Sequence, residues 1–422
     1  PTLTAWWDLI CTKKNKNFYT AELAKVEKYM PFDLAPMQQA YWLGANGAEL
    51  SGAVNAHYYI EIDAQSIDPL LLQRAVYILI ERHDMLRARF LRDGRQLISP
   101  ETPWKGITLH KFEGLSDQEI SIKLEEIRVR LSHRRMDTEA GEVFDVQLSL
   151  LPNNVCRIHI SVEMLVCDAQ SFQIILTELA RLYGWPSEQL PSVNYSFQEY
   201  LANISIRQMK RREEARLYWQ EKLPQLPVRP YLPLALNPNQ LKHQTIGRRH
   251  HRIDPQDFGT LGLRCREKGL TIPSILATAF AEVVGAWSEE QRFLINMPLF
   301  ERNEFHPDVN RIVGDFTNIV IFAADVSREV SITEQARQLQ LQLATDISHS
   351  AYSGLDVLRD LMRSKGSDML MAPIVFTSVI GMGDLYGADF RRIFGNPCWT
   401  ISQTPQVWLD CQVIEDDRGL LI

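Results

Sequence analysis

A proline-dense segment near the middle of the chain constrains the fold more than any other feature. Five prolines stand between positions 224 and 238, directly after a charged helical pattern at 208–221. Proline removes a backbone donor and interrupts both helices and central strands, so this segment is expected to run extended over a surface. We therefore predict an N-terminal lead-in at 1–30, an N-terminal lobe at 31–205, a helix and crossing linker at 206–240, and a C-terminal lobe at 241–422.

The two halves have similar mixed patterns. A chain of 422 residues is too long for one ordinary core, and two domains of roughly 200 residues are the natural expectation. The first half predicts strands at 56–63 and 155–166 and a helix at 69–84. The second predicts strands at 293–297, 319–326, 373–377 and 407–413, and a helix capped by Thr271 whose apolar face holds Ile275, Ala279, Val283 and Ala286. This indicates an α/β (α+β) fold with a site between two lobes.

Composition excludes several classes of function. The net charge of −7 disfavours nucleic acid as a partner. The six cysteines are scattered without a CxxC pair, which argues against a zinc cage or a secreted disulfide framework and favours reduced thiols in the cytoplasm. No run approaches the roughly 20 apolar residues of a membrane span, and no P-loop or GxGxxG motif stands at a strand–helix junction. We expect neither a membrane nor a nucleotide partner.

The most informative stretch is a strand that runs into a polar turn and then a helix. The strand at 155–166 leads into Cys167–Ser171, and we predict a helix at 172–183 with Ser171 as its cap and Gly184 at its end. Two acids, Glu163 and Asp168, stand five positions apart across this exit. Because side chains alternate along a strand, the two acids need not share a face, and a two-carboxylate mechanism is not assumed.

Residues 163–171, EMLVCDAQS, resemble the DxxxxD signature of the heterocyclization domains of nonribosomal peptide synthetases, which are relatives of condensation domains. Further segments are similar to family motifs and fall in the family's order. They are LAPMQQAYWLG at 34–44, RHDMLR at 82–87, VGDFT at 313–317, VFTS at 375–378 and SQTPQVWLD at 402–410. The resemblance spans about residue 30 to the end.

The resemblance implies two chloramphenicol-acetyltransferase-like lobes, arranged as a V-shaped pseudo-dimer around a central tunnel. Upstream and downstream carrier proteins would dock at its two mouths and deliver substrates on phosphopantetheine, with no cofactor bound by the domain itself. An adjacent adenylation domain would be a further partner. The implied reaction joins an acyl donor to carrier-bound cysteine, serine or threonine and closes a thiazoline or oxazoline, by analogy in siderophore synthesis. Orientation of the reacting atoms is the main physical task.

Three residues would carry the chemistry if the resemblance extends to the site. Asp410 and Thr377 match the aspartate and threonine that the family uses for cyclodehydration, since a carboxyl can give one proton to a leaving hydroxyl and take another from nitrogen. Asn296 resembles an asparagine that would hold the tetrahedral oxygen. The alternative for Asp410 is that it ends a strand and caps a turn. Gln406 and Ser402 either line the tunnel or are ordinary polar residues at the ends of a strand.

The signature residues have implied structural roles. Asp168 would anchor the lobe by pairing with an arginine. Glu163 stands where the family has aspartate, so its pair would be displaced or repacked, and it marks either a competent domain or a specialised or silent copy of a tandem pair. Glu163 and Met164 occupy the positions of the condensation-domain histidines. The alternatives to heterocyclization are a domain that forms only the amide, and a copy that docks carriers without turnover.

Overall fold

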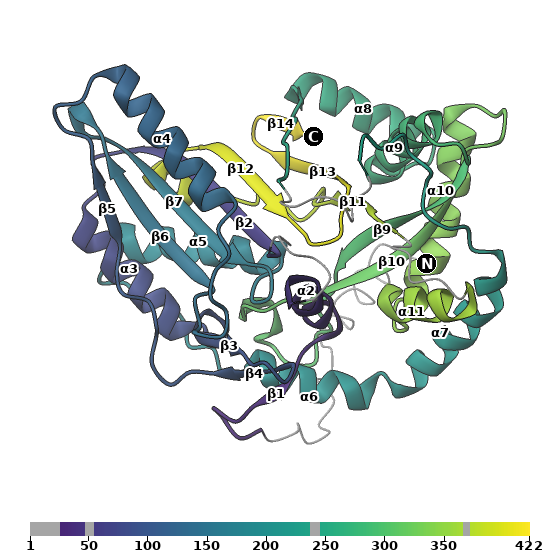
Figure 1. Ribbon diagram of the computed structural model, residues 1–422, viewed down its shortest axis with the longest axis horizontal. Coiled ribbons are helices and arrows are strands. Elements are labelled where there is room, and N and C mark those ends of the chain that lie inside the picture. Colours follow the sequence, from purple (N-terminus) through teal and green to yellow (C-terminus); the bar gives the residue numbers. More distant parts are fainter. Residues whose placement is uncertain (1–25, 47–54, 237–244, 366–371) are drawn as a thin grey trace, which may run out of the picture.

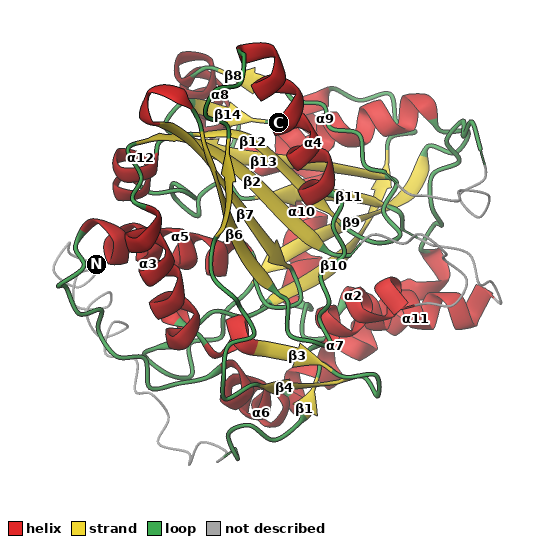
Figure 2. Ribbon diagram, turned by 60° about the vertical axis from the view of Figure 1, so that its left-hand side comes forward, coloured by secondary structure: helices red, strands yellow, loops and turns green. Residues whose placement is uncertain are grey.

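The computed structural model describes residues 26–46, 55–236, 245–365 and 372–422. It contains two large sheets set side by side, each flanked by helices (Figure 1, Figure 2). The predicted mixed α/β class is confirmed. Most of the predicted lead-in at 1–30 lies outside the described residues, and residues 26–30 contain a turn.

The N-terminal sheet has the strand order β12-β2-β7-β6-β5. Apolar side chains of the sheet and of helices α3 and α5 form one core, and the opposite face packs against α4. The bounds are β2 His57–Gln65, α3 Pro69–Arg82, β5 Thr108–Lys111, α4 Asp117–Ser132, β6 Phe144–Leu150, β7 Val155–Glu163, α5 Ala169–Gly184 and β12 Pro397–Gln403. A small sheet, β1-β4-β3, is built from Phe32–Asp33, Arg95–Ile98 and Ala88–Phe90. The helix α2, Pro36–Asn46, lies between the two large sheets (Figure 1).

The C-terminal sheet has the strand order β10-β9-β11-β13-β14-β8. Its core on one side comes from α9, and on the other side from α7 and α11. The bounds are α6 Phe197–Arg207, α7 Met209–Lys222, β8 Arg252–Ile253, α8 Pro255–Glu267, α9 Ile272–Trp287, β9 Arg292–Phe300, β10 Thr317–Asp325, α10 Ile332–Ser348, α11 Gly354–Lys365, β11 Ile374–Ser378, α12 Ala388–Phe394, β13 Leu409–Asp416 and β14 Gly419–Leu421.

Helix α9 shows both the strength and the weakness of a sequence pattern. Thr271 caps it by accepting from the Ser274 amide, as predicted. The predicted apolar face is wrong, because Ala279, Val283 and Ala286 are exposed and the buried residues include Ala277, Ala281 and Val284. The helix lies so near the neighbouring chain that a Cβ at Gly285 would come 2.3 Å from a Val326 methyl. Only a glycine fits at that position without a shift of Val326, and because the helix is apolar on all sides, periodicity does not single out the buried face.

The chain crosses between the lobes after the linker. Residues 226–236 form neither helix nor strand, as the prolines predict. Strand β12 then returns to the N-terminal sheet, where Ser402 is the register partner of Tyr58. Val309, Ile312, Val313 and Phe316 also pack in the N-terminal core. The predicted C-terminal unit 241–422 therefore contributes residues 309–316, helix α12 and strand β12 to the N-terminal lobe, a crossing that local patterns do not reveal.

Within the described part of the chain, no single helix is long and apolar enough to span a membrane; α8 and α9, bent by 98° at their junction, pass that test only as a pair.

Candidate active site

The three predicted catalytic residues lie on one face of the C-terminal sheet. Strand β11 runs parallel to both of its neighbours, and Val375 is the register partner of Asn296 on β9 and of Asp410 on β13. Register partners point to the same side of a sheet, and so does a residue two positions along, which places Thr377 with them. We call Asn296, Thr377 and Asp410 the strand row. Sequence motifs predicted its members, and strand order brings them together.

Asp410 is a carboxyl with hydrogen bonds but no countercharge. The Gln412 amide donates to its Oδ2 at 2.6 Å, and the Thr377 hydroxyl donates to its Oδ1 at 3.5 Å. Within the described ranges no cation pairs with it. Burial raises the pKa of Asp410 to about 6, and the bonds from Gln412 and Thr377 partly oppose this. Such a group exchanges a proton readily near neutral pH, which suits general acid–base work.

The alternative role for Asp410, capping a turn at the end of a strand, does not match its position. It is the second residue of β13, and the bonds to its carboxylate come from the two side chains.

The Asn296 side chain is already engaged in one hydrogen bond. Its Nδ2 donates to the Ala372 carbonyl at 2.6 Å, and its buried Oδ1 has no partner among the described residues. An amide nitrogen has a second proton, and that proton is the one left for a substrate oxygen.

The N-terminal signature is joined to the C-terminal half by a buried polar cluster. Asp168 accepts from the Ser171 amide at 2.7 Å and from Arg302 Nη2 at 3.0 Å, and both charged side chains are almost wholly buried. Arg302 also donates to Ser171 Oγ at 2.8 Å. Ser171 Oγ in turn donates to the Gly314 carbonyl at 2.7 Å and lies 3.0 Å from the Gly314 amide. We call Asp168, Ser171, Arg302 and Gly314 the clasp.

The prediction that Ser171 caps the following helix is wrong. Helix α5 begins at Ala169 with Asp168 as its cap, because the Asp168 carboxylate reaches the Ser171 amide. This frees the serine hydroxyl for Gly314. Position 314 itself leaves no room for a side chain, since a Cβ there would come 2.4 Å from the Phe197 ring. The sequence reading missed Arg302, which lies outside every motif and is located by its contacts alone.

Glu163 lies in a different environment from Asp168. It is wholly buried at the end of β7, where its Oε1 accepts from Asn55 Nδ2 at 2.9 Å and lies 3.9 Å from His57 Nδ1. Its Oε2 has no hydrogen-bond partner in the described part of the chain, and no described arginine pairs with it. The longer side chain is thus accommodated by an amide and an imidazole, so the two signature acids do not form a carboxylate pair.

The two residues proposed to line a tunnel lie on and beyond β12. Ser402 belongs to the strand itself. Gln406 is exposed in the loop between β12 and β13 and has a positive φ of 62°, a conformation uncommon for a residue with a side chain. Neither Ser402 nor Gln406 forms a hydrogen bond with a member of the strand row. Their role as tunnel residues stays a prediction.

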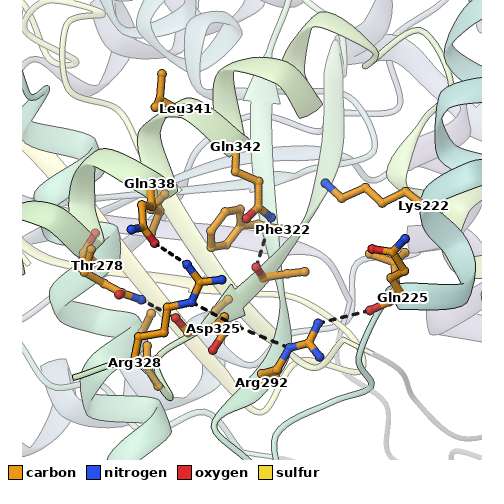
Figure 3. A pocket seen from close by; sticks show the side chains of 17 residues that line it. Lys222, Gln225, Thr278, Arg292, Phe322, Asp325, Arg328, Gln338, Leu341 and Gln342 are labelled. Carbon is orange, nitrogen blue, oxygen red and sulfur yellow. Dashed lines mark hydrogen bonds and ion pairs between the residues drawn. The ribbon is translucent and has the colours of Figure 1, made fainter. Parts of the chain in front are cut away.

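A groove of about 460 Å³ lies elsewhere, between β10, α9 and α10 (Figure 3). Arg292, Arg328 and Asp325 meet at its floor, and Lys222 faces them from α7. None of the predicted site residues lines it. Among the residues that the structure describes, no group of three or more histidine, cysteine or acidic side chains has the geometry to hold a metal ion.

Comparison with known proteins identifies the class. The condensation-domain family matches residues 30–385, so the chain belongs to the condensation-domain family. The six sequence motifs in order and the two large sheets agree with this assignment. A solved structure of a condensation domain from a calcium-dependent antibiotic synthetase, 16% identical, superposes with a TM-score of 0.72 over 94% of this chain and 90% of that chain, which supports the fold.

Three further matches have higher sequence identity to this chain. The EpoB cyclization-docking bidomain of Sorangium cellulosum is 30% identical with a TM-score of 0.85, covering 99% of this chain and 85% of that one. Phenyloxazoline synthase MbtB of Mycobacterium bovis is 40% identical over 93% of this chain, and pyochelin synthetase PchE of Pseudomonas aeruginosa is 34% identical over all of it. The chain spans 28% and 29% of the lengths of these two curated relatives.

Proposed function

We propose that the chain is the heterocyclization domain of a nonribosomal peptide synthetase. It condenses a carrier-bound acyl donor with carrier-bound cysteine, serine or threonine and then closes a thiazoline or oxazoline. One observation carries the proposal: Asp410, with Thr377 beside it, is a partly buried carboxyl that pairs with no cation among the described residues, and its burial raises its pKa to about 6. The cytoplasm, neighbouring carrier proteins and an adenylation domain of the same synthetase are its expected setting.

The proposed reaction has two stages. The amine of the acceptor first attacks the donor thioester, forming an amide and releasing the donor carrier thiol. The acceptor's thiol or hydroxyl then adds to the amide carbonyl. The Asp410 carboxyl gives its proton to the departing oxygen, water leaves as the carbon–nitrogen double bond forms, and the Asp410 carboxylate takes the proton from nitrogen. Thr377 holds the carboxyl in place, and Asn296 donates to the tetrahedral oxygen.

The clasp has a supporting part in this proposal. Asp168, whose Oδ1 accepts from both Arg302 and the Ser171 amide of α5, links the two lobes and takes no part in proton transfer. Glu163 keeps its place through Asn55 and His57, so its extra methylene is compatible with a competent domain. Phosphopantetheine arrives on the carriers, and none of the proposed steps uses a group bound by the domain itself.

Product masses test the proposal directly. The domain is incubated with an acyl-loaded donor carrier and a cysteinyl, seryl or threonyl acceptor carrier. The masses of the products are then measured by mass spectrometry. We expect a product one water lighter than the linear amide, and only the linear amide from Asp410→Ala. Glu415→Ala is the matched control, because it removes a carboxyl from the same strand on the opposite face. A linear amide from the unaltered domain would make it a condensation-only domain, and no product would make it a docking copy.

A further inference from the structure

The two oxygens of the Asp410 carboxyl are held unequally. The Gln412 amide donates to Oδ2 at 2.6 Å, a short hydrogen bond, whereas the Thr377 hydroxyl reaches Oδ1 only at 3.5 Å. Among the residues that the structure describes, each oxygen has no other donor. Proton transfer by a carboxyl requires one of its oxygens to carry the proton, and this inequality decides which one.

Strand geometry places Gln412 for this contact. Gln412 stands two positions after Asp410 on β13, so both side chains leave the same face of the sheet. Gln412 is also the register partner of Thr377 on β11, the neighbouring parallel strand. The amide and the hydroxyl therefore reach the carboxyl from two adjacent strands, and the sheet backbone fixes the starting point of each side chain.

A neutral carboxyl has one carbonyl oxygen and one hydroxyl oxygen, and a donor prefers the carbonyl oxygen because it is the better acceptor. The short bond from Gln412 therefore makes Oδ2 the carbonyl oxygen and leaves the proton on Oδ1. Since Thr377 lies 3.5 Å away, that proton is not held in a strong bond and is free to pass to a substrate oxygen. After the transfer, Oδ1 is still the less engaged oxygen, and it accepts the next proton.

Within the described ranges no charged side chain pairs with Asp410. The Asp410 charge acts on two titratable groups, the Tyr41 phenol of α2 and the Cys411 thiol, which leaves the opposite face of β13. Burial raises the pKa of Tyr41 well above its ordinary value and that of Cys411 to about 11, so both are neutral at neutral pH. Burial raises the pKa of Asp410 to about 6, and the Gln412 bond opposes this more than the Thr377 bond does.

Strand β6 contains the same arrangement with one difference. There the Gln147 amide donates to Asp145 Oδ2 at 2.9 Å, again from two positions along the strand. Arg134 pairs with that same oxygen at 2.8 Å, so Asp145 has the partner of a structural carboxylate. An amide two positions after an aspartate is thus common to both strands, and the absence of a described cation at Asp410 distinguishes the second case.

We propose that Gln412 is a positioning residue for ring closure, its amide holding Asp410 Oδ2 so that Oδ1 carries the transferred proton. The carbon–oxygen bond breaks, and the departing oxygen takes the proton from Oδ1 and leaves as water. The carbon–nitrogen double bond forms, and Oδ1 takes the proton from nitrogen. Gln412 gains and loses no proton. This inference rests on the proposed heterocyclization function.

Gln412→Met tests the inference with loaded carriers, because methionine keeps the length of the side chain and removes the donor. Ring closure should slow on the order of tenfold while amide formation is unchanged. Because the Gln412 bond lowers the pKa of Asp410, its loss should move the fall of the ring-closure rate with rising pH to higher pH. Gln147→Met removes the matching amide of β6 and should alter neither rate nor profile. An unshifted profile in Gln412→Met, or equal slowing of both stages, would overturn the inference.

Infrared spectroscopy locates the proton without turnover. At a pH below its pKa, Asp410 gives a carboxylic carbonyl band that Asp410→Asn lacks, and a hydrogen bond to the carbonyl oxygen lowers the frequency of that band. In Gln412→Met the band should move to higher frequency, and an unmoved band would overturn the inference. The two proposals fail differently. No ring from the unaltered domain refutes heterocyclization, whereas a normal ring with an unmoved band in Gln412→Met refutes only the role of Gln412.

Discussion

The aspartates at 168 and 410 are the same residue type in opposite circumstances. Asp168 is buried with Arg302 at 3.0 Å and caps a helix. Asp410 is held by an amide and a hydroxyl, and burial raises its pKa to about 6. A carboxylate with a cation stays ionised and holds structure, whereas one without a cation can exchange a proton. The groups that contact each carboxylate therefore show which aspartate is the structural anchor and which is the acid. The residue type alone does not.

The largest expected effect is on the anchor. Arg302→Ala leaves the Asp168 charge buried without its cation, and breaking such a pair costs about 3–5 kcal/mol in the free energy of unfolding. Urea denaturation followed by tryptophan fluorescence measures it. Arg392→Ala, which removes an exposed arginine from its pair with Asp389, is the control and should cost less than about 1 kcal/mol. Equal losses in the two variants would mean that the clasp is not the anchor we describe.

The next effect concerns the dependence of stability on pH. Folding raises the pKa of Asp410 to about 6, so the folded protein binds this proton more tightly than the unfolded chain does. Stability from this group is present at low pH and is lost as pH rises from about 4 to about 6. Asp410→Asn removes that loss. Relative to the unaltered domain, its free energy of unfolding should rise by roughly 1–3 kcal/mol between pH 4 and pH 7. Parallel stability curves would show that Asp410 titrates normally.

A smaller effect is expected from Thr377→Val, which keeps the shape of the side chain and removes its hydroxyl. The bond to Asp410 is long, at 3.5 Å, and the loss of one such bond is worth about 1 kcal/mol, or several-fold in rate. Ring closure should slow by roughly that factor while amide formation stays the same. Single-turnover product analysis separates the two stages. Slowing of the amide stage alone would remove Thr377 from the cyclodehydration site.

The smallest effect is expected at the first signature position. Glu163→Asp restores the family's residue but withdraws the carboxylate from Asn55, bonded at 2.9 Å, which should cost about 1 kcal/mol of stability. Ring closure should be unchanged. A faster ring closure in this variant would instead identify Glu163 as an impairment, and a gain in stability would show that the Asn55 contact is unfavourable. Both are read from the same denaturation and product assays.

Sequence motifs named the members of the strand row and predicted an arginine partner for Asp168, but not which arginine it is, and the reason is physical. Thr377 and Asp410 lie in motifs that the resemblance covers, and Asn296 lies on a strand with a clear pattern. Their meeting depends on the order β9-β11-β13, which no local pattern contains. Arg302 comes from an irregular segment, so nothing local distinguishes it from an exposed arginine. The buried face of α9 was predicted wrongly because the helix carries apolar residues on all sides, so periodicity does not distinguish the buried face from the exposed one.

The path of β12 has a consequence for dividing the molecule. Residues 397–403 complete the N-terminal sheet although the chain reaches them only after most of the C-terminal lobe has been made. A protein fragment ending at the proline segment would leave the backbone hydrogen-bonding groups on one edge of β2 unpaired. Such an edge can pair with strands of other chains. On the ribosome, the sheet of the first half must wait for residues 397–403 to emerge before it is complete. Lobes exchanged between relatives would accordingly need to carry this late strand with the earlier half.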